Sequence, residues 1–470
     1  PRNRSSGSVK SGEKLGRRRV RASLSPSGVP IHRLAAPLAK ARLRRRVRLR
    51  SPCRQMLKGA GLSGLALAVR MAQLGWRVTL HEKNDDLRMF GAGIWLWGNG
   101  LKSLEMIGAY EEAVRRAKII KEWRIADQEG NILMTRPMTP GDQLLLPPRA
   151  DLYQSLINRA VAEGVEIRTS STAISARSEG ILVLDNGEER KADLIVAADG
   201  LYSRLRESIY ATRVLDYGIE AGIRMLIQHQ SGDPEDIITE YWNGPWRLLY
   251  NPCTDGQNYI FLSAPIDDER GRKIPIDRDF WRKTFPLQEG LVNRFQEDGR
   301  WDRIGYVRCR SWSDGKVAIL GDAANGMPPN LGQAANMAFT NAMALATIAT
   351  EEENIPEALV KWEKLARPLT EHVQWWSYIY GFIVGNWPSE HLSKRNEAIL
   401  NISKTKWFEK GINRGARSTP LGFKGETISP DPNIYNYEVT GCESALLKET
   451  ITSALGQDSF FNVINKMSGN

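Results

Sequence analysis

Residues 57–83 contain the pattern that most constrains how this chain can fold. Gly59, Gly61 and Gly64 stand in G-x-G-x-x-G spacing, an apolar run with helical periodicity follows them, and a short apolar strand then ends at Glu82. Glycines permit a tight turn and a close approach of the backbone to neighbouring groups. The segment therefore predicts the turn, helix and second strand of a βαβ unit, with free N–H groups at the helix N-terminus where an anion can bind.

The acidic residue at the end of the second strand makes this prediction more specific. Glu82 follows Gly64 at about the distance at which dinucleotide-binding folds place a carboxylate that accepts from a ribose hydroxyl. We therefore interpret the segment as a dinucleotide site. The preceding strand fits less well, because Arg54, Gln55 and Lys58 interrupt what should be a buried apolar run. We expect a poorly formed first strand.

The composition supports a large core and argues against several kinds of site. A chain of 470 residues with 41% hydrophobic residues is long enough for two domains or one composite domain. Five histidines and the lack of a C-x-x-C pair argue against a metal centre, and no apolar run approaches the roughly 18 residues of a membrane span. The widely spaced cysteines predict unpaired thiols in a reducing compartment, the cytoplasm. They are Cys53, Cys253, Cys309 and Cys442.

Residues 1–55 differ in composition from the rest of the chain. They carry 17 Lys and Arg residues and one acid, Glu13, whereas the whole chain has a net charge of +11, so the remainder is net negative. We expect a disordered basic arm, and no nucleic-acid binding by the folded part. Three interpretations of the arm stay open. It is an organellar transit peptide, an arm that binds nucleic acid or anionic lipid, or sequence that is not native, since Met56 is the first methionine.

A second informative segment covers residues 192–206. A continuous apolar strand there ends in Asp199-Gly200, and Ser203 and Arg206 follow. An Asp-Gly pair after a strand is often only a turn. The carboxyl end of a parallel strand, however, is where open α/β sheets bind their ligands. On this segment alone, a turn and a ligand site both stay open.

A third segment, residues 317–348, has a similar arrangement. A short buried strand leads into a turn, and a helix of small residues follows, whose N-terminus offers a second anion site. Asp322 can accept a hydrogen bond from a sugar hydroxyl, or it merely caps the next element. The residues of interest between strand and helix are Gly321, Asp322, Pro329, Gly332 and Gln333.

Further candidates lie between these segments. Arg149 stands at the entry to a predicted helix over residues 147–162 and either faces a ligand or is solvated. Trp95 and Trp97 suit either a loop close to a planar cofactor or packing in the core. Residues 101–118 predict one amphipathic helix. An antiparallel sheet that would cover the site is predicted from strands at residues 222–230, 241–250 and 258–264.

Together the three segments resemble the FAD-dependent aromatic hydroxylases, single-component flavoprotein monooxygenases related to salicylate and para-hydroxybenzoate hydroxylases. The resemblance covers residues 56–400 and implies an α/β fold, with a Rossmann-like FAD-binding domain, an inserted antiparallel-sheet substrate domain and C-terminal helices. The boundaries that we expect are 1–55 for the arm; 56–117, 146–210 and 306–350 for the FAD-binding domain; 118–145 and 211–305 for the sheet domain; 351–422 for the helices; and 423–470 for a tail of unknown role.

The resemblance also implies roles for individual residues. The glycine turn and its acid would hold the ADP part of FAD, the Asp-Gly motif would contact FAD and NAD(P)H, and the third motif would hold the ribityl chain and pyrophosphate. Asn325 and Ala334 stand where the family commonly has His and Gly. Arg224 is the one substrate contact that we suggest, with a solvated strand residue as the alternative; the catalytic base is unknown and no metal is expected. The implied cofactor-binding residues are Gly59, Gly61, Gly64, Glu82, Arg149, Asp199, Gly200, Ser203, Arg206, Gly321, Asp322, Pro329, Gly332 and Gln333.

The activity implied by the resemblance is hydroxylation of a small aromatic or phenolic ring by NAD(P)H and O2, through a C4a-hydroperoxide of the flavin. A flavin reductase or a halogenase of the same fold is one alternative, although Trp95-Leu96-Trp97-Gly98 lacks the rest of a halogenase motif. A non-catalytic binding protein that has lost its cofactor is the other, and the interrupted first strand favours it. A homodimer is the assembly that we expect.

Overall fold

The computed structural model describes residues 53–87, 91–139, 141–209, 212–297, 299–385 and 392–425. All of them belong to one unit of the chain, residues 49–470. The predicted basic arm lies outside the described residues except for residues 53–55, and the predicted tail lies outside them except for residues 423–425. Cys442 is outside them as well.

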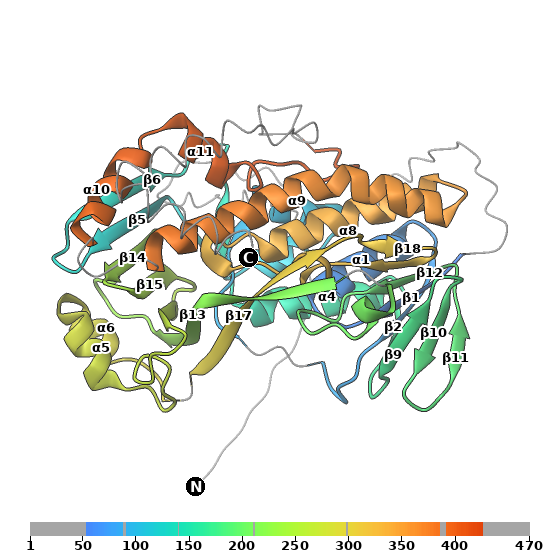
Figure 1. Ribbon diagram of the computed structural model, residues 1–470, viewed down its shortest axis with the longest axis horizontal. Coiled ribbons are helices and arrows are strands. Elements are labelled where there is room, and N and C mark those ends of the chain that lie inside the picture. Colours follow the sequence, from blue (N-terminus) through green and yellow to red (C-terminus); the bar gives the residue numbers. More distant parts are fainter. Residues whose placement is uncertain are drawn as a thin grey trace, which may run out of the picture. The chain divides into compact units, whose positions relative to one another are not determined.

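A six-stranded sheet carries the three predicted motifs (Figure 1). Its strand order is β18-β19-β12-β1-β2-β8, and every pair is parallel except β18 with β19. Since parallel strands all end at the same edge of a sheet, the turns after β1, β12 and β19 meet there. The strands are β1 (Arg54–Lys58), β2 (Arg77–His81), β8 (Glu166–Arg168), β12 (Leu194–Ala197), β18 (Ser313–Asp314) and β19 (Val317–Ile319).

The first strand is well formed, so the expectation of a poor one is wrong. β1 pairs with β12 on one side and with β2 on the other. Its two charged residues lie at its ends, where Arg54 is exposed and Lys58 forms an ion pair of 2.8 Å with Asp199. Leu57 between them is fully buried. The strand forms because the charges avoid its centre and the inner one is neutralised.

Helices cover the parallel sheet and hold its turns. α1 packs against α8, and α8 lies beside α9 (Figure 1). Gly108, with a φ of 72°, ends α2 in the left-handed conformation, so the single helix predicted over residues 101–118 is two helices. The helices are α1 (Leu62–Gln73), α2 (Gly98–Ile107), α3 (Tyr110–Val114), α4 (Arg149–Ala162), α5 (Arg278–Thr284), α6 (Glu289–Val292), α7 (Asp322–Asn325), α8 (Ala334–Glu351), α9 (Ile355–Gly385), α10 (Leu392–Ile402) and α11 (Lys406–Asn413).

A seven-stranded sheet of order β17-β13-β16-β15-β14-β5-β6 matches the predicted antiparallel sheet, although β5 and β14 pair in parallel. The strand predicted over residues 241–250 is a hairpin, because Gly244, with a φ of 54°, turns the chain between β14 and β15. The strands are β5 (Glu122–Asp127), β6 (Ile132–Pro137), β13 (Thr212–Gln228), β14 (Ile237–Asn243), β15 (Trp246–Pro252), β16 (Gln257–Pro265) and β17 (Arg300–Cys309).

The two faces of this sheet differ. Ile223, Leu248 and Ile260 lie on one face and pack against Trp281 and Phe285 of the α5 region. Side chains alternate along a strand, so the neighbouring residues, including Arg224 and Phe261, lie on the opposite face. That opposite face is the one that meets the parallel sheet's ligand edge.

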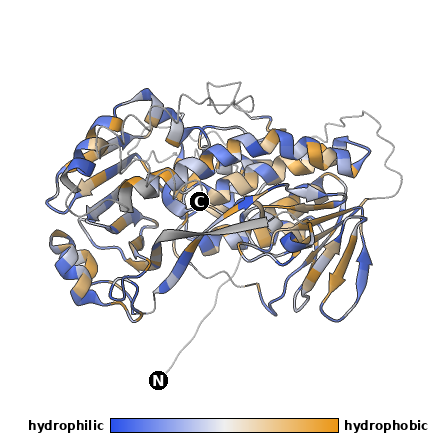
Figure 2. Ribbon diagram, in the orientation of Figure 1, coloured by the Kyte–Doolittle hydropathy of each residue, from blue (hydrophilic) through white to orange (hydrophobic). Residues whose placement is uncertain are grey.

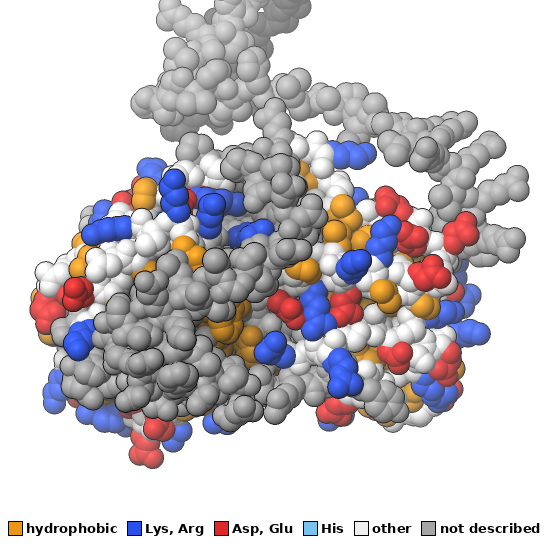
Figure 3. Space-filling model, turned by 45° about the horizontal axis from the view of Figure 1, so that its top comes forward, with side chains coloured by type: hydrophobic (Ala, Val, Ile, Leu, Met, Phe, Trp, Pro, Cys, Tyr) orange, Lys and Arg blue, Asp and Glu red, His pale blue; other side chains and the backbone are white. Residues whose placement is uncertain are grey.

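Two small sheets complete the described strands. They are β3 (Leu96–Trp97), β4 (Lys118–Ile119) and β7 (Leu144–Leu146), and the hairpin sheet β9 (Ala173–Arg177), β10 (Ile181–Leu184) and β11 (Glu189–Lys191). Figure 2 shows apolar residues along α8 and the parallel strands, where the largest buried cluster lies. On the face drawn in Figure 3, basic and acidic side chains are interspersed.

Neither a membrane-spanning helix nor a metal site is found among the described residues. None of the helices within these ranges combines the length and apolar character that a membrane crossing requires. The same ranges contain no group of three or more His, Cys, Asp or Glu side chains that could hold a metal ion.

Candidate cofactor and substrate site

A cavity of about 750 Å³ lies at the ligand edge of the parallel sheet and is bounded by the seven-stranded sheet. Its wall includes residues from all three predicted motifs. The predicted residues that line it are Gly59, Gly61, Glu82, Arg149, Asp199, Gly200, Arg224, Gly321, Asp322, Pro329, Gly332 and Gln333. Gly64, Ser203 and Arg206 are close in the chain to this wall but do not line it.

Glycine is required at the three positions of the first motif for different structural reasons. Gly59 has a φ of +100°, and a Cβ atom there would lie 2.5 Å from the Ala198 carbonyl oxygen. A Cβ atom on Gly64, within α1, would lie 2.1 Å from the Gly59 carbonyl oxygen. At Gly61 the nearest atom to such a Cβ is 3.9 Å away, and this glycine faces the cavity. Two glycines are thus needed for packing, and the middle one keeps the cavity open.

The end of β2 presents a carboxylate and an imidazole beside the glycine turn. Glu82 Oε2 accepts from the Ala60 backbone N–H at 2.9 Å, and Oε1 accepts from the Asn84 backbone N–H at 3.0 Å. Oε1 also accepts from Asn84 Nδ2 at 2.8 Å, whereas Oε2 can accept a further hydrogen bond, so Glu82 can still accept from a ligand hydroxyl through Oε2. His81 is fully buried; its Nδ1 lies 2.8 Å from Ser171 Oγ, and burial lowers its pKa to about 4.

The Asp-Gly motif after β12 divides into cavity residues and structural residues. Asp199 Oδ2 pairs with Lys58 Nζ, while its buried Oδ1 has no hydrogen-bond partner in the described part of the chain. Ser203 Oγ accepts from the Arg206 backbone N–H at 3.1 Å. The Arg206 guanidinium donates to the carbonyl oxygens of Ala323, at 2.9 Å, and Leu201, at 2.7 Å. Arg206 thereby ties this turn to the turn after β19.

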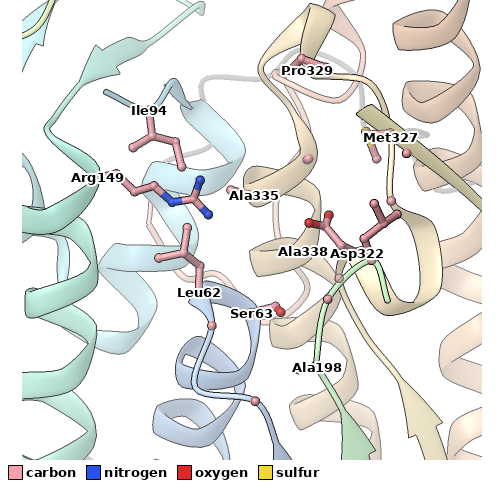
Figure 4. A pocket seen from close by; sticks show the side chains of 18 of the residues that line it. Leu62, Ser63, Ile94, Arg149, Ala198, Asp322, Met327, Pro329, Ala335 and Ala338 are labelled. Atoms are coloured by element: carbon pink, nitrogen blue, oxygen red, sulfur yellow. The ribbon is translucent and has the colours of Figure 1, made fainter. Parts of the chain in front are cut away.

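Arg149 and Asp322 project into the cavity from opposite sides, from the start of α4 and the start of α7 (Figure 4). Burial lowers the pKa of Arg149, and the nearby Arg224 lowers it further. Burial raises the pKa of Asp322, against the opposing effect of Arg149. The Asp322 side chain is accessible from the cavity although protein surrounds it. Arg149 is half-buried and Asp322 is open to the cavity, so the two side chains leave room for a polar ligand between them.

The third motif also presents unsatisfied polar groups. Gln333 is 1% exposed, and neither its Oε1 nor its Nε2 has a hydrogen-bond partner within the described ranges. Gly332, with a φ of +61°, lies against the ring of Trp95, which lines the cavity. Trp97 does not line it, and its Nε1 donates to the Leu331 carbonyl oxygen at 3.1 Å. Of the two tryptophans, one is therefore a cavity residue and the other is core.

Several cavity residues come from the seven-stranded sheet and were not predicted from the sequence. Their side chains share the sheet face that carries Arg224, and no motif or spacing marks them. They are Glu240, Arg247, Leu249, Tyr259, Phe261 and, after β19, Asn330.

These residues fit FAD. A buried polar group without a partner costs free energy unless a ligand satisfies it. Among the described residues, the unpaired atoms on this wall include the Gln333 amide, Asp199 Oδ1 and, at Arg149, Nε. They lie beside a helix N-terminus. The glycine turn before that helix has no side chains, so its backbone can approach a ligand closely, which is the arrangement that holds a pyrophosphate.

Comparison with known proteins identifies an FAD-binding family. Residues 56–354 match the family model described as an FAD binding domain. A probable 2-heptyl-3-hydroxy-4(1H)-quinolone synthase of Rhodococcus erythropolis is 37% identical over 328 residues, which is 68% of this chain and 85% of that protein. The solved tetrameric form of 2-methyl-3-hydroxypyridine-5-carboxylic acid oxygenase is 33% identical, with a TM-score of 0.70 over 79% of this chain and 98% of that one.

A third match concerns the fold alone. Klebsiella pneumoniae HpxO, solved in complex with FAD and uric acid, is 19% identical, with a TM-score of 0.69 over 79% of this chain and 98% of that one. The family model covers more than half of the chain, and two relatives exceed 30% identity over most of their own length. The resemblance inferred from the three motifs is confirmed. The chain belongs to the FAD-dependent aromatic hydroxylases, and it is a flavoprotein monooxygenase with FAD as its cofactor.

Proposed function

We propose that this monooxygenase hydroxylates a nitrogen-containing aromatic ring, using NAD(P)H and O2. The balanced reaction converts a ring C–H, O2, NAD(P)H and H⁺ into a ring C–OH, NAD(P)⁺ and H2O. The observation that supports it is a single cavity shared by the FAD motifs and by an aromatic face of the seven-stranded sheet. One relative above is named for the quinolone that it makes and another for the hydroxypyridine that it oxygenates, which favours a heteroaromatic ring over a simple phenol.

We propose that the cavity residues of the three motifs hold FAD. The glycine turn and the α1 N-terminus would receive the pyrophosphate, and Glu82 a ribose hydroxyl. Bound FAD supplies the transfer of two electrons from the nicotinamide and the activation of O2. Gly64, Ser203 and Arg206, which do not line the cavity, would act by holding the turns in place. The direct contacts would come from Gly59, Gly61, Glu82, Arg149, Asp199, Gly200, Gly321, Asp322, Pro329, Gly332 and Gln333.

The chain's own residues would bind the ring and exclude water. Tyr259 and Phe261 offer flat apolar surfaces on the sheet face, and both are at least 93% buried. Arg224 lines the cavity, paired with Asp302 at 3.3 Å, and its guanidinium carbon lies 5.0 Å from the centre of the Phe261 ring. We propose Arg224 as a substrate contact at the edge of this surface.

We propose that the nicotinamide docks at Tyr202 and Arg204, which line the cavity beside the Asp-Gly motif. Tyr202 is 77% exposed, an unusual position for a large aromatic side chain. It can stack on a planar ring, and Arg204 can contact a phosphate. This dock would be transient, because the described residues contain one glycine turn of the dinucleotide type.

The domain boundaries and the assembly are also proposals. The strands of the parallel sheet and those of the seven-stranded sheet alternate along the chain, which supports a discontinuous FAD-binding domain (56–117, 146–210 and 306–350) and a sheet domain (118–145 and 211–305). The sequence predicts a homodimer, whereas the solved relative is named as a tetrameric form. We propose a second copy of this chain as a partner, and light scattering would distinguish two copies from four.

The test of the proposed function uses the purified full chain. Its visible spectrum should show stoichiometric flavin. NADH and NADPH oxidation should rise when quinolones, hydroxypyridines or phenols are added, and ¹⁸O2 should label the product with one oxygen atom. A colourless protein that does not take up added FAD, or oxidation that yields only peroxide with every ring, would contradict the proposal. The intact β1 strand removes the reason to expect a protein without cofactor.

A further inference from the structure

A buried cluster of charged side chains on the seven-stranded sheet forms part of the cavity wall. Glu220, Glu240 and Arg247 come from β13, β14 and β15, and their side chains are 2%, 3% and 4% exposed. Glu240 and Arg247 line the cavity, and Glu220 does not. Burying charges costs free energy unless they are paired, so we expect this cluster to have a role beside the substrate surface.

The positive charge of this cluster is fully engaged by protein carboxylates. Arg247 Nη1 donates to Glu240 Oε1 at 2.9 Å. Arg247 Nη2 donates to both oxygens of Glu220, at 2.6 and 2.7 Å, and to Asn330 Oδ1 at 2.8 Å. The guanidinium therefore already has two carboxylates around it. It offers little to the carboxylate of a ligand.

Glu240, in contrast, retains acceptor capacity. Its Oε1 accepts from Trp242 Nε1 at 2.8 Å and from Arg247, and its Oε2 accepts from the Tyr380 hydroxyl at 3.1 Å. A carboxylate oxygen can accept two hydrogen bonds, so Oε2 has room for one more donor. Donors from three different elements fix the orientation of the carboxylate. Glu240 is thus an oriented acceptor on the wall of the cavity.

The charge balance of the region favours a donor over an anion. Two carboxylates share one guanidinium, and the adjacent charges Asp127 and Arg395 offset each other. Within this cluster one negative charge is left over, and it lies beside Leu249, the residue paired with Glu240 across the sheet, while Arg224 at the Phe261 ring has its own partner, Asp302. In such a poorly hydrated place a second carboxylate would be repelled, whereas an N–H or O–H group would form a charge-assisted hydrogen bond.

From these contacts we infer that Glu240 determines substrate specificity by accepting a hydrogen bond from the ring. The site takes an uncharged heteroaromatic ring that carries an N–H or O–H donor, and it rejects a ring that places a carboxylate at the same point. Arg247, Trp242 and Tyr380 are positioning residues for Glu240. This inference rests on the proposed function, because it assumes that the ring lies on the sheet face.

The first experiment titrates the FAD-loaded full chain with matched ligands and follows the flavin absorbance. The ligands are 4(1H)-quinolone, its N-methyl derivative, an isomer methylated on a ring carbon with the N–H intact, and quinoline-4-carboxylate. A hydrogen bond to a charged acceptor predicts that both N–H ligands bind about 10- to 100-fold more tightly than the N-methyl and carboxylate ligands. Equal affinities for the N–H and N-methyl ligands, or tighter binding of the carboxylate, would overturn the inference.

The second experiment compares Glu240→Gln with the matched variant Glu220→Gln. Each change removes one carboxylate charge and leaves Arg247 with the other, so neither leaves a buried guanidinium unpaired. Glu240→Gln should reduce the N–H to N-methyl preference by about 10-fold or more, because an amide is a weaker acceptor. Glu220→Gln should keep that preference, since Glu220 does not line the cavity. Equal ratios in both variants would show that net charge, and not Glu240, sets the preference.

Binding is measured apart from turnover, so the two proposals can fail separately. Flavin content and thermal unfolding of each variant show whether it is folded and loaded. A loaded protein that prefers N–H ligands but hydroxylates none of them would leave the Glu240 inference in place and contradict the proposed function. A loaded protein that hydroxylates rings without preferring N–H ligands would contradict the Glu240 inference and leave the proposed function in place.

Discussion

Substituting Gly64 by alanine tests whether packing at the glycine turn determines both stability and cofactor binding. The new Cβ atom would lie 2.1 Å from the Gly59 carbonyl oxygen, whereas ordinary contacts begin at 3.4 Å. The α1 helix and the turn would have to separate by about 1.3 Å. Gly59 cannot easily move, because the Ala198 backbone already lies close to it.

The free-energy change has two opposing parts. Overpacking of this kind costs about 3 kcal/mol, while alanine is favoured over glycine inside a helix by about 1 kcal/mol. We therefore expect the free energy of unfolding of the Gly64→Ala apoprotein to fall by about 2 kcal/mol. FAD should also bind more weakly, because the displaced turn no longer presents its N–H groups in register.

Gly61→Ala is the matched control, since it adds the same methyl group on the same turn. The nearest atom to its Cβ is 3.9 Å away, so the apoprotein should lose less than about 1 kcal/mol, the cost of a poorer helix N-cap. FAD affinity should still fall, because the methyl group faces the cavity. Urea unfolding of both apoproteins and FAD titration by fluorescence measure the two effects. A Gly64→Ala apoprotein as stable as the unchanged chain would refute the reasoning.

Three further predictions concern charges around the same cavity. Burial holds the pKa of His81 at about 4, below its unfolded value of about 6.5. The contribution of His81 to the free energy of unfolding is therefore fully present above pH 6.5 and falls by about 3 kcal/mol as the pH drops to 4. His81→Gln should reduce this dependence on pH in urea unfolding. Lys58→Met leaves the Asp199 carboxylate without its ion pair, which should cost about 3 kcal/mol, and the double variant with Asp199→Asn should recover most of the loss. Tyr202→Ala should raise the KM for NAD(P)H by about 3- to 10-fold with little change in kcat, and Arg204→Ala should weaken the salt dependence of that KM.

Each of these predictions has an outcome that would contradict it. An unchanged pH slope in His81→Gln would assign the slope to other groups, such as His372, whose pKa burial also lowers to about 4. If the Lys58→Met and Asp199→Asn effects simply add, the two residues are not coupled. If Tyr202→Ala changes kcat and KM together, the tyrosine supports the fold of the turn rather than the nicotinamide.

The sequence alone determined the parts of this protein that depend on local spacing. The G-x-G-x-x-G turn, Glu82 at the end of the next strand and the two later strand–turn motifs identified the FAD-binding fold and ten of the residues that line the cavity. These motifs can be read because a turn or a helix N-terminus is made by residues that are neighbours in the chain. Two local turns were missed, the left-handed helix end at Gly108 and the hairpin turn at Gly244, because a glycine inside an amphipathic or apolar pattern does not by itself indicate a positive φ.

Only the tertiary structure decided the rest, because the decisive partners are distant in sequence. The sequence predicts a poor β1 strand because the residue that neutralises Lys58 is Asp199, which follows β12 and is distant in the chain. The substrate wall had no sequence pattern at all. Strand register alone brings Glu240, Arg247 and Glu220 together on one sheet face, and no local rule predicts which strands pair or in what register.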